Sequence, residues 1–239
     1  MRPVDRENNI YNSGKLNQIG SEESLLFQWL EDILKLSNHP PKGLDIGCGM
    51  GSITKKIQES GCVVKGYDFS DVAIQRAIES GVDAYLRDFD TGIPEADNSF
   101  DFIWCTDVIE HVFDPIFLFE EFNRVLRPSG KVFMTIPNNM AVGNRVMALF
   151  GISPQSTTYR NYRQCKHHTM FSIELMKYMI TIANFKIEQF VGLRNYPFLR
   201  FMPRKNKKKS YKGSFYAGLF AHVFCLQLVK SSDILNKTV

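Results

Sequence analysis

A glycine-rich turn between a short apolar segment and an amphipathic one constrains the fold of this chain more than any other feature. The run is Leu44-Asp45-Ile46-Gly47-Cys48-Gly49-Met50-Gly51. We expect a strand over 43–46 before it and a helix over 52–59 after it. Glycines at such a junction allow positive φ and let a ligand lie directly on the backbone. The run therefore predicts a nucleotide-type site, with a purely structural turn for close helix packing as the alternative.

Strands and helices are expected to alternate on both sides of this turn. The first helix begins at Ser21 and is closed by Pro40-Pro41. Further strands are expected at 62–67, 84–86, 100–105, 131–136, 185–191 and 217–229, and further helices at 70–80, 115–126 and 172–183. This order favours one α/β domain with a mostly parallel sheet covered on both faces. The segment 137–165 lacks a clear period and is expected to be irregular, as a lid would be.

Asp68 ends the second expected strand, 21 residues after Gly47. A carboxylate there can accept hydrogen bonds from both hydroxyls of an unphosphorylated ribose. The alternative is a cap for the next helix, although Ser70 is at least as well placed for that role. A phosphate-binding G-x-G-x-x-G pattern would require glycine where Ser52 stands. The spacing therefore favours a nucleoside without a pyrophosphate, and a nicotinamide dehydrogenase is the weaker alternative.

Composition and cysteine spacing predict a cytoplasmic protein. Hydrophobic residues make up 44% and charged residues 23%, as in ordinary soluble domains. The five cysteines show no CxxC spacing, which disfavours a disulfide framework or a zinc site. The N-terminal residues lack the apolar core of a signal peptide. The longest apolar stretch, 215–229, is shorter than the roughly 20 residues that span a bilayer, so no transmembrane segment is expected.

Four further runs carry a family resemblance. They are Gly66-Tyr67-Asp68-Phe69-Ser70, Arg87-Asp88-Phe89-Asp90, the segment 100–112 (FDFIWCTDVIEHV) and the segment 122–131 (FNRVLRPSGK). With the glycine turn, they make residues 40–136 resemble class I S-adenosylmethionine-dependent methyltransferases, especially the ubiquinone-biosynthesis O-methyltransferase branch. The resemblance implies a Rossmann-like fold with a mostly parallel seven-stranded sheet and an antiparallel last strand. It also implies S-adenosyl-L-methionine as the cofactor.

The resemblance assigns cofactor-binding roles to one set of residues. The glycine turn would support the methionine and ribose parts, Asp68 would hold the ribose, and Asp88 would approach the adenine amino group. Asp45 would orient the turn, and Thr106 would pass beside the sulfonium. The cofactor-binding residues predicted in this way are Asp45, Gly47, Gly49, Gly51, Asp68, Phe69, Asp88, Phe89 and Thr106.

Two histidines are candidate catalytic residues. A hydroxyl acceptor must lose a proton, and histidine has a pKa suited to that work near neutrality. His111 follows the strand that leads to Thr106, and His167 resembles the first histidine of the H-x-x-x-F-S/T entry to a late helix in relatives. A structural role is the alternative for both. Glu110 and His111 could hold a divalent metal, but two ligands do not define a site, so no metal is predicted.

The segment Arg194–Lys212 interleaves basic and aromatic residues. It could be a solvated hairpin, or it could face an anionic or lipid-linked acceptor, a membrane surface or RNA. RNA is disfavoured because no recognised RNA-binding module accompanies the segment. We therefore expect a small-molecule acceptor, methylated on a hydroxyl, with peripheral membrane contact as an option. Methylation of RNA or protein, and a non-catalytic cofactor-binding module, are the alternatives.

These expectations divide a single methyltransferase domain, 1–239, into four parts. Residues 1–39 would form an N-terminal helical cap, and residues 40–136 the cofactor-binding core. Residues 137–169 would form a lid or acceptor segment, and residues 170–239 the C-terminal helix and strands. The acceptor contacts would come from the cap and from the lid segment, where no transferable motif stands, so the sequence does not identify the acceptor.

Overall fold

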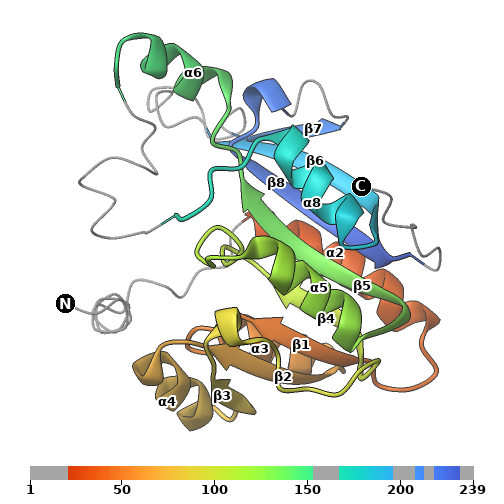
Figure 1. Ribbon diagram of the computed structural model, residues 1–239. Helices are drawn as coiled ribbons and strands as arrows, with labels where there is room; N and C mark the ends of the chain where they lie inside the picture. The colour runs from red at the N-terminus through yellow and green to blue at the C-terminus, as the bar shows by residue number, and fades with distance from the viewer. Residues whose placement is uncertain (1–20, 153–166, 196–207, 213–217, 232–239) are drawn as a thin grey trace.

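The computed structural model describes residues 21–152, 167–195, 208–212 and 218–231. Its strands are β1 (Lys42–Ile46), β2 (Val63–Asp68), β3 (Ala84–Leu86), β4 (Phe100–Cys105), β5 (Leu126–Pro137), β6 (Phe185–Asn195), β7 (Lys208–Lys212) and β8 (Val223–Lys230). Its helices are α2 (Ser21–Leu36), α3 (Ser52–Glu59), α4 (Asp71–Glu79), the 3₁₀ turn η1 (Phe89–Thr91), α5 (Pro115–Val125), α6 (Val142–Leu149) and α8 (Ile173–Ile182). All of the strands join one sheet (Figure 1).

The strand order is β3-β2-β1-β4-β5-β8-β6-β7. The first five of these are parallel neighbours, while β8 runs antiparallel to both β5 and β6. This confirms the predicted mostly parallel sheet with an antiparallel last strand. An eighth strand, β7, extends the sheet because residues 208–212 pair back on residues 191–195 of β6. Of the segment Arg194–Lys212, residues 194–195 and 208–212 therefore belong to the sheet, and residues 196–207 lie outside the described residues.

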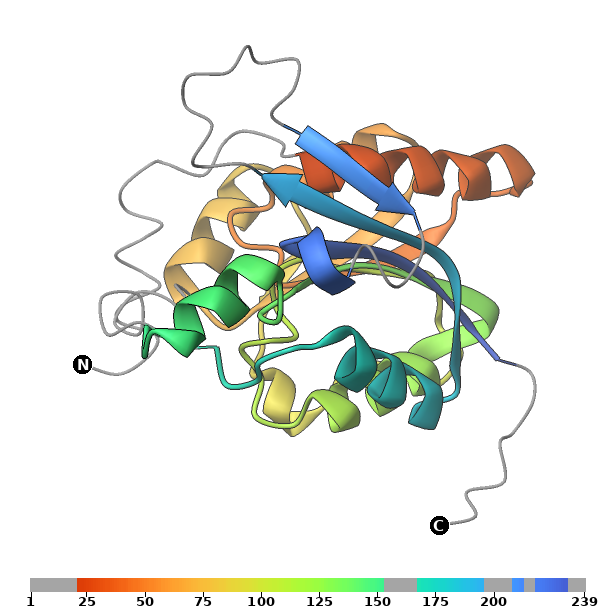
Figure 2. The same ribbon diagram turned by 90° about the horizontal axis from the view of Figure 1, so that it is seen from above.

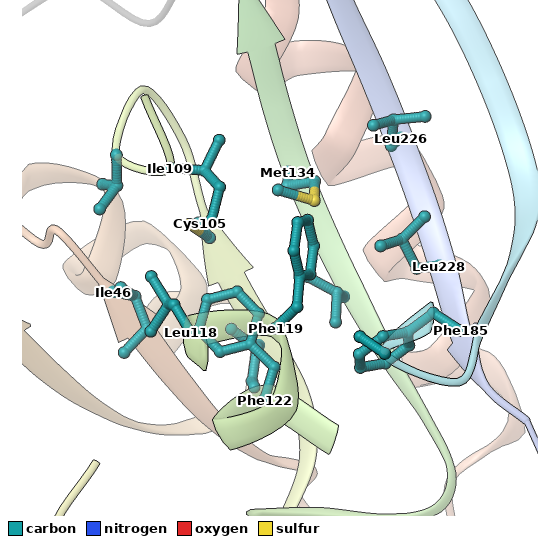
Figure 3. Close-up of a cluster of buried hydrophobic side chains, with 14 of the residues drawn as sticks. Ile46, Cys105, Ile109, Leu118, Phe119, Phe122, Met134, Phe185, Leu226 and Leu228 are labelled. Carbon is teal, nitrogen blue, oxygen red and sulfur yellow. The ribbon is translucent and has the colours of Figure 1, made fainter. Parts of the chain in front are cut away.

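Helices cover both faces of the sheet (Figure 2). On one face, Leu26 and Leu30 of α2 pack in one buried cluster with Phe102, Trp104 and Phe133 of the sheet. The opposite face carries the larger cluster, to which α5 and α8 contribute (Figure 3). The alternation along β4, where 102 and 104 face α2 and 103 and 105 face α5, follows from the two-residue period of a strand. The central strands β1, β4, β5 and β8 are thereby largely buried on both faces.

Polar caps fix where the main helices begin. Ser70 accepts a hydrogen bond from the N–H of Ala73 at the start of α4, and Ser172 caps α8 in the same way. Asp114 caps α5, where Pro115 occupies the first helical position. These side chains satisfy N–H groups that have no partner within the helix, and each such cap contributes about 1 kcal/mol. All three helices follow loops at the carboxyl edge of the sheet, so the caps also fix that edge.

Three segments differ from the sequence-based expectation. The strand expected at 217–229 begins only at Val223, because residues 218–220 are helical. The stretch expected to be irregular, 137–165, contains α6 at 142–149. The turn expected at 127–130 lies within β5, where the pairing with β4 shifts register between Phe100 and Phe102. The extra residues are accommodated by that irregularity, which resembles a β-bulge. Among the described residues, no helix is long and apolar enough to cross a membrane.

Candidate active site

The glycine turn joins β1 to α3 at the carboxyl edge of the sheet. Gly47, Gly49 and Gly51 have φ values of +78°, +53° and +79°, a region that side chains rarely adopt. The N–H groups of Gly47 and Cys48 both donate to the carbonyl of Tyr67, at 2.8 and 3.0 Å. The turn is therefore anchored on the end of β2, next to Asp68.

The loop after β4 packs directly on this turn. A Cβ at residue 47 would lie 2.2 Å from Cγ2 of Val108, far closer than atoms approach in proteins. Gly47 is thus required both by its φ and by the closeness of Val108. The loop after β4 and the glycine turn are consequently in direct contact through Val108.

Asp68 fastens the turn through its carboxylate. Oδ2 accepts a hydrogen bond from the N–H of Gly49 at 2.9 Å, and Oδ1 accepts one from the N–H of Ser70 at 2.9 Å. Burial raises the pKa of Asp68, and these backbone donors oppose the rise. The helix-cap alternative for Asp68 is wrong, because the α4 cap is the hydroxyl of Ser70. Each carboxylate oxygen has a second lone pair with which to accept a ligand hydroxyl.

Asp45 lies beneath the turn. It is 2% exposed, and its Oδ2 accepts a hydrogen bond from the Thr54 hydroxyl at 2.6 Å. Burial raises the pKa of Asp45 to about 7, although the Thr54 hydrogen bond lowers it, and the nearby charge of Asp68 adds to the rise. The Asp45–Thr54 hydrogen bond ties β1 to the first turn of α3 and so holds the two ends of the glycine turn together.

The residues expected near the adenine follow β2 and β3. Asp88 is exposed, and its carboxylate accepts a hydrogen bond from the N–H of Asp90 at 3.0 Å. Phe69 is half-buried directly after Asp68. Phe89 is 5% exposed and its ring belongs to the core beside α5, so its side chain is not available to a ligand. Among these three residues, Asp88 and Phe69 present side-chain surface.

The loop after β4 contains Asp107, a residue to which the sequence analysis gave no role. It follows Thr106, which is half-buried, and it has a φ of +56°. The N–H of Asp107 donates to Oγ1 of Thr135 at 3.0 Å, and that hydroxyl donates to Oδ1 of Asp107 at 2.9 Å. A left-handed residue other than glycine costs about 1–3 kcal/mol and tends to occur at functional sites. No sequence pattern marks it, because the left-handed backbone is visible only in the structure.

The two candidate histidines come together. The ring centroids of His111 and His167 lie 4.9 Å apart, with planes at 82°. The carbonyl of Glu110 accepts hydrogen bonds from the N–H groups of His168 and Thr169, at 2.7 and 3.3 Å. These bonds hold the segment before α8 against the loop after β4. Two histidines separated by more than fifty residues therefore share one site.

Glu110 completes this histidine–glutamate cluster, which we define as Glu110, His111 and His167. One ligand atom from each of the three lies within 4.8 Å of the others. Burial raises the pKa of Glu110 to about 8, and the nearby Asp107 charge adds to this; burial also lowers the pKa of His167 to about 4, with His111 contributing. Oε2 of Glu110 and Nδ1 of His167 are buried without a hydrogen-bond partner in the described part of the chain.

The cluster has the chemistry of a divalent metal site. A carboxylate and neutral imidazoles are ligands for several divalent cations, and a cation would satisfy the two unpartnered atoms. The sequence offered Glu110 and His111 as two such ligands. The structure adds His167 as the third, which is the ligand that sequence spacing could not supply.

The sheet is parallel with one inserted antiparallel strand, and its carboxyl edge carries a glycine turn after β1 and an acid at the end of β2. This fold and these features define a class I S-adenosylmethionine-dependent methyltransferase. The chain belongs to the methyltransferase domain family, whose model matches residues 20–189. S-adenosylmethionine is the cofactor of this class.

Relatives and solved structures agree with this assignment. The chain is 31% identical over 120 residues to a ubiquinone biosynthesis O-methyltransferase of Pseudomonas entomophila, covering 48% of this chain and 51% of the relative. It is 34% identical over 103 residues to the enzyme of that name from Idiomarina loihiensis, covering 41% and 42%. The alignments thus span about half the length of these relatives or less.

A solved structure from Thermotoga maritima shares the fold along nearly the whole chain. It is described as an S-adenosylmethionine-dependent methyltransferase and possible histamine N-methyltransferase. The TM-score is 0.64 at 19% identity, covering 95% of this chain and 98% of the other. At this identity the likeness establishes the fold alone.

Proposed function

We propose that this chain transfers a methyl group from S-adenosylmethionine to a hydroxyl oxygen of a small-molecule acceptor. The observation that carries the proposal is the packing of one loop. Val108 lies against Gly47 of the cofactor-side turn, while Glu110 and His111 of the same loop meet His167. A cofactor on the glycine turn and an acceptor beside the histidines would then be neighbours. The sequence relatives, described as O-methyltransferases, favour oxygen as the accepting atom.

Several groups would bind different parts of S-adenosylmethionine. Asp68 would accept the ribose hydroxyls with its remaining lone pairs, and Asp88 would accept from the adenine amino group. The backbone of Thr106 would pass beside the sulfonium, while Asp45 keeps the turn in shape from below. Bound S-adenosylmethionine supplies a methyl group on a positively charged sulfur, which is a good leaving group. The protein's share is to align the accepting oxygen with that carbon–sulfur bond.

The acceptor side would handle the proton. His111 would take the proton from the acceptor hydroxyl as the oxygen–carbon bond forms. His167, whose pKa is held near 4 by burial and by His111, stays neutral at pH 7 and can orient the acceptor. In the alternative arrangement, Glu110, His111 and His167 would hold a divalent cation, which would lower the pKa of a bound acceptor hydroxyl; His111 would then be a ligand and not the base. The acceptor class that suits the basic segment 194–212 is anionic or lipid-linked.

Calorimetric titration with S-adenosylmethionine, S-adenosylhomocysteine and NAD tests the proposal. We expect saturable binding of both sulfur nucleosides and none of NAD. Asp68→Asn should weaken that binding at least tenfold because an amide oxygen replaces a charged acceptor. The matched control is Glu79→Gln, an exposed acid at the end of α4, which should bind like the wild type. A folded wild-type protein that binds neither nucleoside would contradict the proposal.

The same titrations lead on to the acceptor. With the cofactor established, turnover of hydroxylated aromatic and lipid-linked acceptors separates an enzyme from a non-catalytic binding module. A macromolecular acceptor would instead bind with an affinity that falls steeply with salt, because phosphate contacts release counterions. Turnover of a small hydroxylated acceptor with weak salt dependence is the result we expect.

A further inference from the structure

Phe113 is an exposed aromatic residue beside the histidine–glutamate cluster. It lies in the loop after β4, between His111 and the Asp114 cap of α5, and its side chain is 74% exposed. Its ring nonetheless contacts another ring, because the centroids of Phe113 and His168 lie 4.2 Å apart with planes tilted by 35°. A side chain that lies mostly in water adds little to the core. Its contact with the residue next to His167 is therefore the more informative feature.

The segment 167–171 carries His167 and is attached to the fold by identifiable contacts. Two of its backbone N–H groups donate to the carbonyl of Glu110 in the loop after β4, and another donates to the side chain of Asn139 after β5. The ring contact with Phe113 adds a side-chain attachment at the surface. The place of His167 beside the other members of the cluster depends on how firmly these contacts hold the segment.

The backbone of Phe113 is tied to the turn on the expected adenine side. Its N–H donates to Oδ1 of Asp90 at 2.9 Å. Asp90 belongs to η1, and its own N–H donates to Oδ1 of Asp88 at 3.0 Å. Asp88 is the residue expected to accept the adenine amino group. Phe113 therefore has its backbone on η1 and its ring on the segment that carries His167.

We propose that Phe113 is a positioning residue that holds the segment 167–171 against the loop after β4 and makes the placement of His167 depend on η1. A cofactor bound by Asp88 fixes η1, and the hydrogen bond between Asp90 and Phe113 passes that restraint to the segment. The inference rests on the proposed function, in which the cofactor lies beside η1 and the acceptor beside His167. Cofactor binding thereby prepares the acceptor side before the acceptor arrives.

Amide hydrogen exchange of the full chain tests the proposal without an acceptor. The reporters are the amides of residues 168, 169 and 171, because each must break its hydrogen bond to exchange. The probe is S-adenosylhomocysteine. In the wild type we expect the probe to slow exchange at these amides about threefold to tenfold, the factor that corresponds to one aromatic pair. In Phe113→Ser, exchange in the free protein should be faster by a similar factor, and the probe should no longer slow it.

Conservative variants separate positioning from a general loss of structure. Phe113→Tyr keeps the ring and should exchange like the wild type. Asp90→Asn keeps an oxygen acceptor for the Phe113 N–H and should retain the effect of the probe, whereas Asp90→Ala should lose it. The matched control is Leu36→Ser, which changes an 84% exposed residue at the end of α2, at the opposite edge of the sheet, and should exchange like the wild type. The urea midpoint of Phe113→Ser should stay close to that of the wild type, since the ring is mostly exposed.

Thermodynamic linkage adds a quantitative check. If the probe tightens the segment, the segment must tighten the binding of the probe by the same factor. Calorimetric affinity for S-adenosylhomocysteine should therefore fall in Phe113→Ser by the factor by which the probe slows exchange in the wild type.

The outcomes distinguish this inference from the proposed function. Equal exchange at the three amides in the wild type and in Phe113→Ser, or a probe that binds the wild type without slowing them, would overturn the inference and leave the proposed function standing. A wild type that does not bind the probe would refute the proposed function and the link to η1 together. The exchange rates of the free proteins would then decide alone whether Phe113 holds the segment.

Discussion

Replacing Gly47 with alanine should lower the free energy of unfolding for two reasons, a strained backbone and a steric clash. The residue has a φ of +78°, and a Cβ there would lie 2.2 Å from Cγ2 of Val108. The left-handed backbone costs about 1 kcal/mol for alanine, and forcing a methyl group into a packed site costs about 1–3 kcal/mol more. Gly47→Ala should therefore lower the free energy of unfolding by about 2–4 kcal/mol.

Gly81 isolates the backbone cost alone. It has a φ of +86°, and a Cβ there would meet nothing within 4 Å. Gly81→Ala should lower the free energy of unfolding by only about 1 kcal/mol. Urea denaturation followed by circular dichroism measures both variants.

Val108→Ala provides the decisive comparison. It removes Cγ2 of Val108, and the remaining Cβ would lie 3.6 Å from the new methyl group, an ordinary contact. In the Val108→Ala background, Gly47→Ala should cost about as much as Gly81→Ala, roughly 1 kcal/mol, which gives a favourable coupling of about 1–3 kcal/mol in the double-mutant cycle. A coupling of zero would refute the argument that the loop after β4 packs on the glycine turn.

Two further predictions concern buried and paired charges. Folding raises the pKa of Asp45 from 3.8 to about 7. Between about pH 4 and pH 7, Asp45 is therefore protonated in the folded state but ionised in the unfolded state. The contribution of Asp45 to the free energy of unfolding consequently falls as the pH rises from about 4 to 7. Asp45→Asn should thus be more stable than the wild type at pH 8, by up to about 4 kcal/mol, and the gap should shrink by pH 5 in urea titrations; a gap independent of pH would contradict this. Arg124 donates to Glu121, Asp97 and the carbonyls of residues 93 and 95, so Arg124→Lys should cost about 2 kcal/mol in urea. Arg127→Lys, which loses one pairing with Asp101, should cost under about 1 kcal/mol, and equal costs would argue against the network.

The core of the fold could be predicted because its signals are local. Strands and helices from α2 to α5 follow from hydrophobic period and from punctuation by glycine and proline, and their observed bounds lie within a few residues of the expected ones. Helix α6 was missed because it has no buried face to impose a period. Strand β7 was missed because its pairing with β6, rather than its lysine-rich sequence, makes it a strand.

Some features of the candidate site could likewise be predicted from the sequence, and others could not. The glycine turn could be found from sequence because glycine itself marks the left-handed backbone. The meeting of Glu110 with His167 could not, because it depends on backbone hydrogen bonds from residues 168 and 169 across the fold. Whether Asp68, Asp88 and Thr106 contact a cofactor stays a prediction, as do the catalytic roles of His111 and His167.

The insertion of β8 between β5 and β6 affects the order in which the strands can pair during synthesis. Strand β5 receives its partner on one side from β4, which precedes it, but on the other side from residues 223–229, which are synthesised long afterwards. Strand β6 likewise waits for β8. During synthesis, the backbone groups along one side of β5 lack their native partner strand until residues 223–229 emerge. The nascent cofactor-binding half therefore carries an open sheet edge, able to pair with other strands, for much of translation.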